Sequence, residues 1–313
     1  MSKKLAVIAI GGNSLIKDSK HQSVEDQYVA THDTCVYIAD LIQEGWNVIV
    51  THGNGPQVGF ILLRSDMSKG KLHEVPLDSC GADTQGAIGY HIQQNLQNEF
   101  QARGISKVCT TVVTQVVVDK DDPSFKKPNK PIGPFYNETE ARKYEAEKGW
   151  AVSEDAGRGW RRVVASPNPL RIVELDAIKT LVHAGAAVIA VGGGGIPVIE
   201  DKGKLIGTAA VIDKDRASAL LAQNLEASHF IISTAVEKVS LNFGKPDQKD
   251  IDKMTMAEAR KYMADGHFKP GSMKPKIEAA INFLECGGEA VIITSPEKLL
   301  DAVHGKTGTL ITR

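Results

Sequence analysis

Three lysines stand in settings that suit chemistry better than simple exposure to solvent. Lys130 lies in the Pro-rich segment PNKPIG, Lys214 lies in AVIDKD between an apolar run and a helix start, and Lys276 lies in PGSMKPK at another helix start. Phosphoryl transfer requires fixed cations and N–H groups that stabilise the charge spread over the transferred group, and the lysine ammonium is a compact cation of this kind. The three lysines therefore indicate chemistry on a phosphate if the fold brings them to one crevice.

Carboxylates flank one of these lysines, and a serine precedes another. Asp213 and Asp215 lie on either side of Lys214, where a carboxylate can hold the ammonium in one orientation; capping of the helix by Asp215 is the competing interpretation. Ser272 is a candidate N-cap of the helix that contains Lys276. The free N–H groups at such a helix start also suit a nucleotide phosphate.

Glycine-rich segments follow three apolar runs that are predicted to be strands. They are IGGN at residues 10–13, THGNGP at 51–56 and VGGGGIP at 191–197. Ligands bind at the carboxyl edge of a parallel sheet, and glycine lets backbone N–H groups approach an anion closely. We therefore expect one oxyanion-binding crevice; the alternative is that each segment is only a tight turn.

Several common motifs are absent from the sequence. There is no GxxxxGK[ST] segment, and the glycine run at 192–197 has Pro197 where a dinucleotide fingerprint needs its last glycine. HExxH, GxSxG and the HRD and DFG signatures of protein kinases are also missing. These absences disfavour P-loop, NAD-dependent, metalloprotease, serine-hydrolase and protein-kinase chemistry.

The apolar pattern predicts an α/β protein with a parallel sheet and helices on both faces. The predicted strands are residues 5–10, 48–51, 110–118, 186–191, 230–233 and 290–294, and the predicted helices are 24–42, 85–102, 170–183, 216–225, 256–264 and 275–284. The segment from Asp119 to Pro169 breaks this alternation, with DDPSFKKPNKPIGPF followed by EDAGRGWRRVVASP. Long insertions of this kind are usually lids or binding loops.

Composition limits the partners and the compartment. The 313 residues contain 37 Lys and Arg against 38 Asp and Glu, so no global positive field favours nucleic acid or an anionic membrane. The first apolar run, residues 5–10, is too short for a signal peptide, and no stretch is long enough to span a membrane. The four cysteines form no CxxC pair, which predicts reduced thiols and a cytoplasmic protein.

Taken in order, these segments resemble the carbamate kinases of the amino-acid kinase family over essentially the whole chain. The similar segments are IAIGGN, THGNGPQVG, PLDSCGADTQGAIGY, TQVVVDKDDPSFKKPNKPIGPFY, EDAGRGWRRVV, GGGGIPVI, AVIDKDRAS, NFGKP and GHFKPGSMKPKIEAAI. The resemblance implies a three-layer α/β/α sandwich with a mostly parallel central sheet and a small protruding lid subdomain. It implies one kinase domain, in which residues 1–210 form the carbamate lobe with a lid at about 119–169, and residues 211–313 form the nucleotide lobe.

The resemblance also implies roles for individual residues. The catalytic lysines would be Lys130, Lys214 and Lys276, with Asp215 as the carboxylate that orients lysines. The loops around carbamate and the transferred phosphate would contain Gly11, Gly12, Asn13, Gly53, Asn54 and Gly55. The nucleotide pocket would contain Lys214, Lys276, Thr234, Val236, Phe243, Gly244, Lys245, Ser272 and Met273. Two alternatives stay open, since Asn13 and Asn54 also suit turns and Phe243 and Met273 also suit a core.

The implied reaction is ATP + carbamate ⇌ ADP + carbamoyl phosphate, with Mg²⁺ bound through the nucleotide phosphates and no metal ligands from the protein. The resemblance further implies a homodimer, a place in arginine metabolism through the arginine deiminase pathway, and no nucleic acid or membrane partner. A kinase acting on another small carboxylate, such as N-acetylglutamate or glutamate, and a non-catalytic nucleotide sensor are the alternatives. Ala235 stands where the wider superfamily often has aspartate, and Phe243 where tyrosine is common, so both positions bear on nucleotide affinity.

Overall fold

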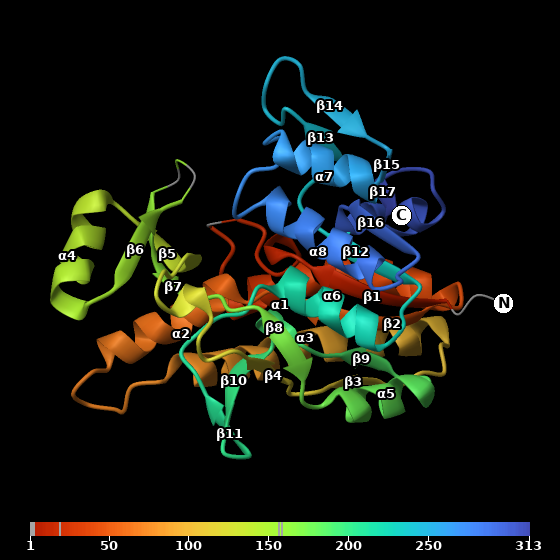
Figure 1. Ribbon diagram of the computed structural model, residues 1–313. Helices are drawn as coiled ribbons and strands as arrows, with labels where there is room; N and C mark the ends of the chain where they lie inside the picture. Colours follow the sequence, from red (N-terminus) through yellow and green to blue (C-terminus); the bar gives the residue numbers. More distant parts are fainter. Residues whose placement is uncertain (1–3, 19, 156, 158) are drawn as a thin grey trace.

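The computed structural model describes residues 4–18, 20–155, 157 and 159–313. Its centre is an eight-stranded sheet of order β15-β17-β16-β12-β1-β2-β9-β3 (Figure 1). The strands are β1 (Leu5–Ile10), β2 (Asn47–His52), β3 (Cys109–Thr111), β9 (Ala187–Ile189), β12 (His229–Ser233), β15 (Lys253–Thr255), β16 (Ala290–Thr294) and β17 (Thr309–Thr312). The sheet is parallel except at one edge, where β17 pairs antiparallel with β16 and parallel with β15. The predicted mostly parallel sheet is confirmed.

The central strands are apolar throughout because both of their faces are covered. All residues of β1 are buried, with Val7 and Ala9 in one core and Ala6 and Ile8 in the other. Alternate side chains of a strand point to opposite faces, so one continuous apolar run serves two cores. This is why the strands appear in the sequence as unbroken hydrophobic runs and not as alternating patterns.

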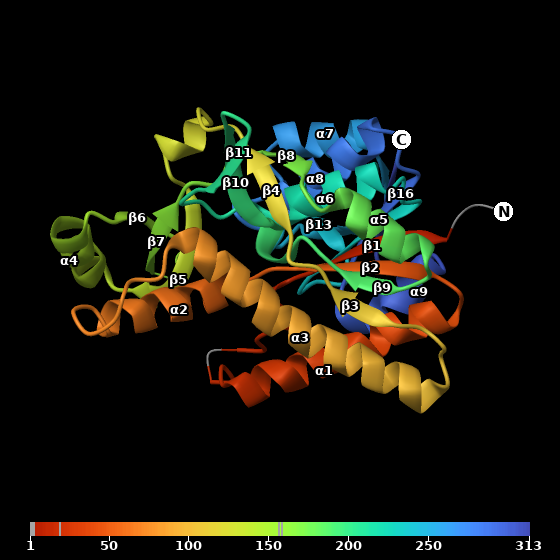
Figure 2. The same cartoon turned by 90° about the horizontal axis from the view of Figure 1, so that it is seen from below.

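Helices form the two outer layers, as Figure 2 shows. One face is covered by α1 (Val24–Gln43), α3 (Leu77–Arg103) and α9 (Leu299–Val303), and the other by α5 (Leu175–His183), α6 (Lys214–Asn224), α7 (Met256–Ala264) and α8 (Met273–Glu285). Helix α1 begins with a capping box formed by Ser23 and Asp26, and the chain leaves it through Gly45 at φ 87°. The three-layer sandwich predicted from the resemblance is confirmed.

A second sheet, of order β11-β10-β4-β8, lies beside the sandwich. It contains β4 (Gln115–Val118), β8 (Pro169–Ile172), β10 (Ile196–Asp201) and β11 (Lys204–Gly207), and the β10–β11 hairpin projects from the body (Figure 1). The prediction of one strand over residues 110–118 is therefore wrong, since β3 and β4 belong to different sheets. The chain changes sheets at Thr114, whose N–H and carbonyl are both held by the side chain of Gln85.

Two helix starts differ clearly from the prediction, and one long helix was not predicted. The helix expected from residue 170 begins at Leu175, because Pro169–Ile172 pairs with β4 as an edge strand. The helix expected from Gln85 begins eight residues earlier, at Leu77. Helix α2 (Gly55–Met67) was not predicted, although proline in the first turn, as at Pro56, is compatible with a helix start.

The insertion forms a unit of its own that protrudes from the sandwich (Figure 1). It begins with a short 3₁₀ turn (Pro123–Phe125), followed by β5 (Lys130–Tyr136), α4 (Glu138–Lys148), β6 (Ala151–Glu154) and β7 (Trp160–Val164). The three strands pair antiparallel in the order β5-β7-β6, and the rings of Tyr136, Tyr144 and Trp150 pack together beside them. We call β5, α4, β6 and β7 the lid subdomain. Ala156 and Arg158, within the EDAGRGWRRVV segment, lie outside the described residues.

Two further features complete the described fold. The strands β13 (Val239–Leu241) and β14 (Lys249–Ile251) form a hairpin that projects beside α7 (Figure 1). Within the described ranges, no helix combines the length and the hydrophobicity needed to cross a membrane.

Helix α2 and the lid subdomain touch backbone to backbone at two glycines. A Cβ added to Gly59 of α2 would lie 2.1 Å from Cα and 2.7 Å from the nitrogen of Gly133 in β5. Neither of these backbone atoms can move aside without moving the strand. We therefore expect Gly59→Ala to separate α2 from β5 and to destabilise the protein by about 1–3 kcal/mol, the usual cost of overpacking. Thermal unfolding and limited proteolysis of the lid subdomain would measure this.

Gly86→Ala is the matched control for this substitution. Gly86 lies within α3 and an added Cβ there has no atom within 4 Å. Alanine is the better helix former, so the control should unfold at the same temperature or slightly higher. If Gly59→Ala kept the unfolding temperature and the protease resistance of the parent protein, the close contact would not determine the position of the lid subdomain.

Candidate active site

The carboxyl ends of the central parallel strands meet at one edge of the sheet. Ile10, the last residue of β1, pairs with His52 of β2 on one side and with Ser233 of β12 on the other. The residues that directly follow these three strands therefore lie side by side; they are Gly11 after β1, Gly53 after β2 and Thr234 after β12. Strand β9 pairs parallel with β2, so its glycine-rich continuation reaches the same edge. The structure thus brings together the three glycine-rich segments that the sequence predicted to form one crevice.

The glycines after β9 allow two neighbouring side chains to pack against bare backbone. A Cβ added to Gly192 would lie 2.3 Å from Nε2 of His52, and a Cβ added to Gly193 would lie 2.1 Å from Nδ2 of Asn54. The amide of Asn54 is buried and also donates to Thr84 Oγ1 at 2.9 Å. Asn54 thus ties the segment after β2 to α3, which is more than a turn residue does. Asn13 lies in a short 3₁₀ helix, Gly12–Ser14, and its side chain is outside the part of the chain that the structure describes.

His52 is a site residue that the sequence analysis did not single out. Its imidazole is fully buried, and Nδ1 lies 2.9 Å from the carbonyl oxygen of Gly53. A carbonyl can only accept, so Nδ1 carries the proton. Burial lowers the pKa of His52 to about 4, although the Gly53 hydrogen bond opposes this shift. The imidazole is therefore neutral at neutral pH. The sequence signal that could have identified His52 is its position at the end of a strand, directly before a glycine-rich loop.

Lysine and aspartate side chains converge at the start of α6. The ammonium of Lys214 lies 2.5 Å from Oδ1 of Asp215, and the ammonium of Lys276, in the first turn of α8, lies 2.9 Å from Oδ2 of the same carboxylate. The side chains are 12%, 14% and 4% exposed for Lys214, Lys276 and Asp215. One buried carboxylate thus holds two ammonium groups from different helices.

These contacts shift the protonation equilibria of all three groups. Burial raises the pKa of Asp215, but the charges of Lys214 and Lys276 outweigh it and hold that pKa well below its ordinary value. Burial lowers the pKa of Lys214, and Asp215 offsets only part of this effect. For Lys276 burial also acts downward, but the attraction of Asp215 is stronger and the pKa is raised. The cluster carries a positive charge whenever both lysines are protonated, which suits an anionic ligand.

Contacts to β2 and to Ser218 hold both the side chain and the backbone of Lys214. A Cβ on Gly53 would lie 3.5 Å from Cδ of Lys214, so the lysine stem runs directly over the glycine after β2. In addition, Ser218 donates to the Lys214 carbonyl and its hydroxyl lies 2.6 Å from that of Thr51 in β2. The ammonium of Lys214 is therefore held beside the glycine-rich edge.

The third lysine reaches the same helix start from the lid subdomain. Lys130, the first residue of β5, places its ammonium 2.5 Å from Oδ2 of Asp213. The other oxygen of Asp213 caps α6 by accepting the N–H of Asp215 at 3.0 Å and of Arg216 at 3.4 Å. The capping interpretation for Asp215 is wrong, because Asp213 is the cap and Asp215 binds lysines. Ser272 stands at the N-cap of α8, but its side chain makes no capping hydrogen bond.

A cleft of about 400 Å³ opens next to this cluster, between the base of the lid subdomain and the start of α8. Its walls include Lys130, Asp213, Arg216, Gly271 and Lys274. Burial raises the pKa of Asp213, but the ammonium of Lys130 outweighs it and the pKa is lowered. In the described part of the chain, the lining contains four cationic side chains against three carboxylates, Asp155, Asp213 and Glu278. A polyanionic ligand such as a nucleotide would find cations on both sides of the cleft, at Lys130 and at Lys274.

Comparison with known proteins decides the family. Residues 4–295 match the model of the amino acid kinase family. The chain belongs to the amino-acid kinase family. Among curated members, a carbamate kinase of Thermococcus kodakarensis is 50% identical over 314 residues, which cover 99% of each chain. A carbamate kinase-like protein, YahI, of Escherichia coli is 50% identical and covers 99% of both chains. The carbamate kinase of Giardia lamblia bound to AMP-PNP superposes with a TM-score of 0.91 at 41% identity, over 99% of both chains. The predicted family is confirmed.

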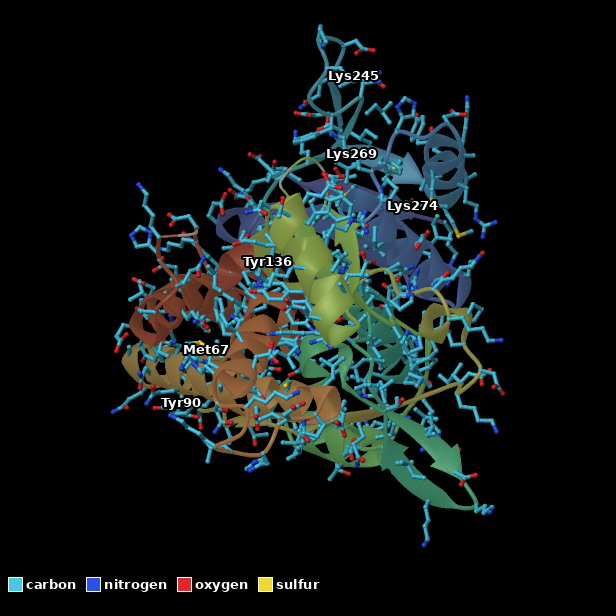
Figure 3. All side chains as sticks on the ribbon, turned by 90° about the vertical axis from the view of Figure 1, so that its left-hand side faces the viewer. Met67, Tyr90, Tyr136, Lys245, Lys269 and Lys274 are labelled. Atoms are coloured by element: carbon cyan, nitrogen blue, oxygen red, sulfur yellow. The ribbon has the colours of Figure 1, made fainter. Side chains whose placement is uncertain are left out.

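The residues that the family resemblance assigns to the nucleotide fall into two groups. Thr234 and Val236 directly follow β12, and Met273 is partly buried against the core at the start of α8, close in sequence to Lys276. Phe243, Gly244 and Lys245 lie in the exposed loop between β13 and β14. Figure 3 shows Lys245 at the tip of this loop, with Lys269 and Lys274 below it. Phe243 is 50% exposed, so the core interpretation is wrong for it, whereas Met273 does pack on the core.

Proposed function

We propose that this protein is a carbamate kinase that transfers the γ-phosphoryl group of ATP reversibly to carbamate, giving ADP and carbamoyl phosphate. The observation that carries the proposal is the pair of ammonium groups of Lys214 and Lys276 on the buried carboxylate of Asp215, beside the glycine-rich edge of the sheet. This arrangement provides fixed positive charge where a transferred phosphoryl group would need it. The 50% identity to a carbamate kinase supports carbamate as the acceptor.

The chemistry requires positioning more than covalent catalysis. A carbamate oxygen attacks the γ-phosphorus in line as the bond to the β,γ-bridging oxygen breaks, and ADP leaves with that electron pair. Carbamate already carries an anionic oxygen, so no general base is needed. Lys214 and Lys276 stabilise the transferred group, Asp215 orients both lysines, and Lys130 contributes its charge from the base of the lid subdomain.

The substrate loops follow from the same geometry. The backbone N–H groups around Gly11, Gly12, Gly53 and Gly55 would hold carbamate and the transferred phosphoryl group, with Asn13 and Asn54 beside them. The nucleotide would lie on the side of residues 211–313, along Thr234, Val236 and the start of α8 at Ser272 and Met273, with Phe243, Gly244 and Lys245 at its outer end. Residues 1–210, including the lid at about 119–169, would form the carbamate lobe.

Magnesium fits this site only together with the nucleotide. Among the described residues there is no group of three or more His, Cys, Asp or Glu side chains that could hold a metal ion. Both aspartates near the lysines are already engaged by ammonium groups. A Mg²⁺ ion, which usually binds through substrate phosphates, would therefore be held by ATP or ADP and would neutralise part of the phosphate charge.

The reverse reaction is the direct test of this proposal. Purified protein with ADP, carbamoyl phosphate and Mg²⁺ should form ATP at a rate proportional to enzyme, measured with a coupled ATP assay. The second candidate is a kinase for N-acetylglutamate or glutamate, so ATP consumption with each of these acceptors is measured in parallel. The carbamate assignment fails if ATP is consumed with one of those acceptors while carbamoyl phosphate gives none. Binding of nucleotide without any phosphoryl exchange would instead indicate the sensor, for which Ala235 is the only sequence support.

We also propose a cytoplasmic homodimer. Each of the four cysteines is a free thiol, with Cys35, Cys80 and Cys109 buried, as a reducing compartment permits. The family resemblance supports the dimer, and large exposed apolar side chains such as Met67, Tyr90, Leu205 and Ile206 offer contact area (Figure 3 labels the first two). Light scattering of the purified protein should give twice the 33.7 kDa of one chain.

A further inference from the structure

Asp213 uses its two carboxylate oxygens for two different structures. Oδ1 accepts the N–H groups of Asp215 and Arg216 and so caps α6, the helix that carries Lys214. Oδ2 receives the ammonium of Lys130 at 2.5 Å, from the first residue of the lid subdomain. The side chains of Asp213 and Lys130 are 13% and 29% exposed. One carboxylate therefore joins the lid subdomain to the helix that carries part of the lysine cluster.

Backbone pairing places Lys130 at the base of the lid subdomain and next to the segment that leads to Asp213. Lys130 pairs with Val164 of β7, and Ala165, which follows, forms a parallel bridge with Ala210. The N–H of Val211 donates to the Ala165 carbonyl at 2.9 Å. The two ends of the ion pair are thus fixed by main-chain hydrogen bonds, and only the long lysine side chain remains to be oriented.

We propose that Asp213 is the positioning residue for Lys130: its carboxylate holds the ammonium at the wall of the cleft, at a fixed place relative to Lys214 and Asp215. This inference rests on the proposed function. A lysine side chain loses considerable rotamer freedom when it is held in one pose, so a carboxylate that orients it beforehand reduces that cost in the reaction. Asp213 acts through Lys130 and has no direct role with the substrate.

Asp213→Asn separates the two roles of this residue. Asparagine is as good an N-cap as aspartate, so α6 should be preserved and the unfolding temperature should fall only by the loss of the ion pair with Lys130. The neutral amide no longer attracts the ammonium, so kcat/KM for carbamoyl phosphate should fall by roughly 10- to 10²-fold, the effect of a misplaced catalytic group. Asp213→Ala removes the cap as well and should lower both the activity and the unfolding temperature.

A double-mutant cycle with Lys130→Met gives the decisive measurement. If Asp213 acts through Lys130, Asp213→Asn should cost almost nothing further in the Lys130→Met protein. The inference is overturned if Asp213→Asn keeps the parent kcat/KM, or if its fold-loss is equally large with and without Lys130. Asp122→Asn is the matched control, because Asp122 also caps a turn in the insertion by accepting the N–H groups of Ser124 and Asn168. It should retain full activity.

The same four proteins distinguish this inference from the proposed function. If the parent protein makes no ATP from carbamoyl phosphate, the proposed function fails and the kinetic cycle has no signal. The free energies of unfolding still report whether Lys130 and Asp213 are coupled, since both side chains are largely buried. If the parent protein is inactive and the free energies of unfolding show no coupling between Lys130 and Asp213, the positioning role of Asp213 is overturned as well.

Discussion

Replacing Lys214 or Lys276 with alanine should lower kcat by roughly 10²- to 10⁵-fold while the protein stays folded. The range is that measured for a single oxyanion-hole donor at its lower end and for an arginine finger at its upper end. Both ammonium groups are close to one carboxylate and neither has a second role in the core, so the loss should appear in the chemical step. Steady-state kinetics of ATP formation and far-UV circular dichroism together measure the effect.

Two comparisons make this result specific. Lys214→Met and Lys276→Met keep most of the side-chain volume and should be as impaired as the alanine variants, since only the charge matters. Lys261→Ala, at an exposed position of α7, is the control and should have parent activity. Turnover close to that of the parent in either alanine variant would remove that lysine from the mechanism.

The sequence was sufficient to find the lysines but not to pair them. Lys214 has an aspartate on each side, and both can cap a helix or bind an ammonium. The outcome depends on where α6 begins: Asp213 keeps an extended backbone (φ −70°, ψ 125°) and becomes the cap, while Asp215 lies in the first turn, where Lys276 of α8 can reach it. That contact joins residues 61 positions apart, and local sequence contains no information about it.

The errors in the fold prediction have the same origin. Residues 110–118 form a good apolar run, but Gln85, from a distant helix, holds Thr114 by two hydrogen bonds and so divides the run between two sheets. The third glycine segment was predicted as an anion-binding loop, and part of its glycine content is explained by close packing. Gly192 and Gly193 lie against His52 and Asn54, contacts that appear only when β2 and β9 are neighbours. Tertiary contacts therefore decided every feature that the local pattern left open.

Asp215→Asn should be the most informative change to the cluster, because it alters stability and catalysis together. The substitution leaves two largely buried ammonium groups without their shared carboxylate, and breaking a buried ion pair typically costs about 3–5 kcal/mol. Activity should fall by roughly 10²-fold or more, since the lysines would no longer be oriented. Asp252→Asn is the control: Asp252 also pairs with a lysine, Lys238 at 2.6 Å, but it is 76% exposed, so neither property should change measurably.

The pH profile separates loss of orientation from loss of charge. In the parent protein burial already lowers the pKa of Lys214, and the negative charge of Asp215 is the largest influence that raises it again. Activity requires the ammonium form, so it should decline as the pH rises through the pKa of Lys214. Asp215→Asn removes the raising influence from Lys214 and Lys276 alike, so this alkaline decline should move to lower pH. The same substitution also changes how stability depends on pH. Asp215 has a lowered pKa in the folded state, so its ionised form stabilises the fold at pH values above the pKa of the unfolded state. The difference in the free energy of unfolding between the parent and Asp215→Asn should therefore shrink as the pH falls into the acidic range. An alkaline limb that stays in place while kcat falls would mean that Asp215 orients the lysines without setting their charge.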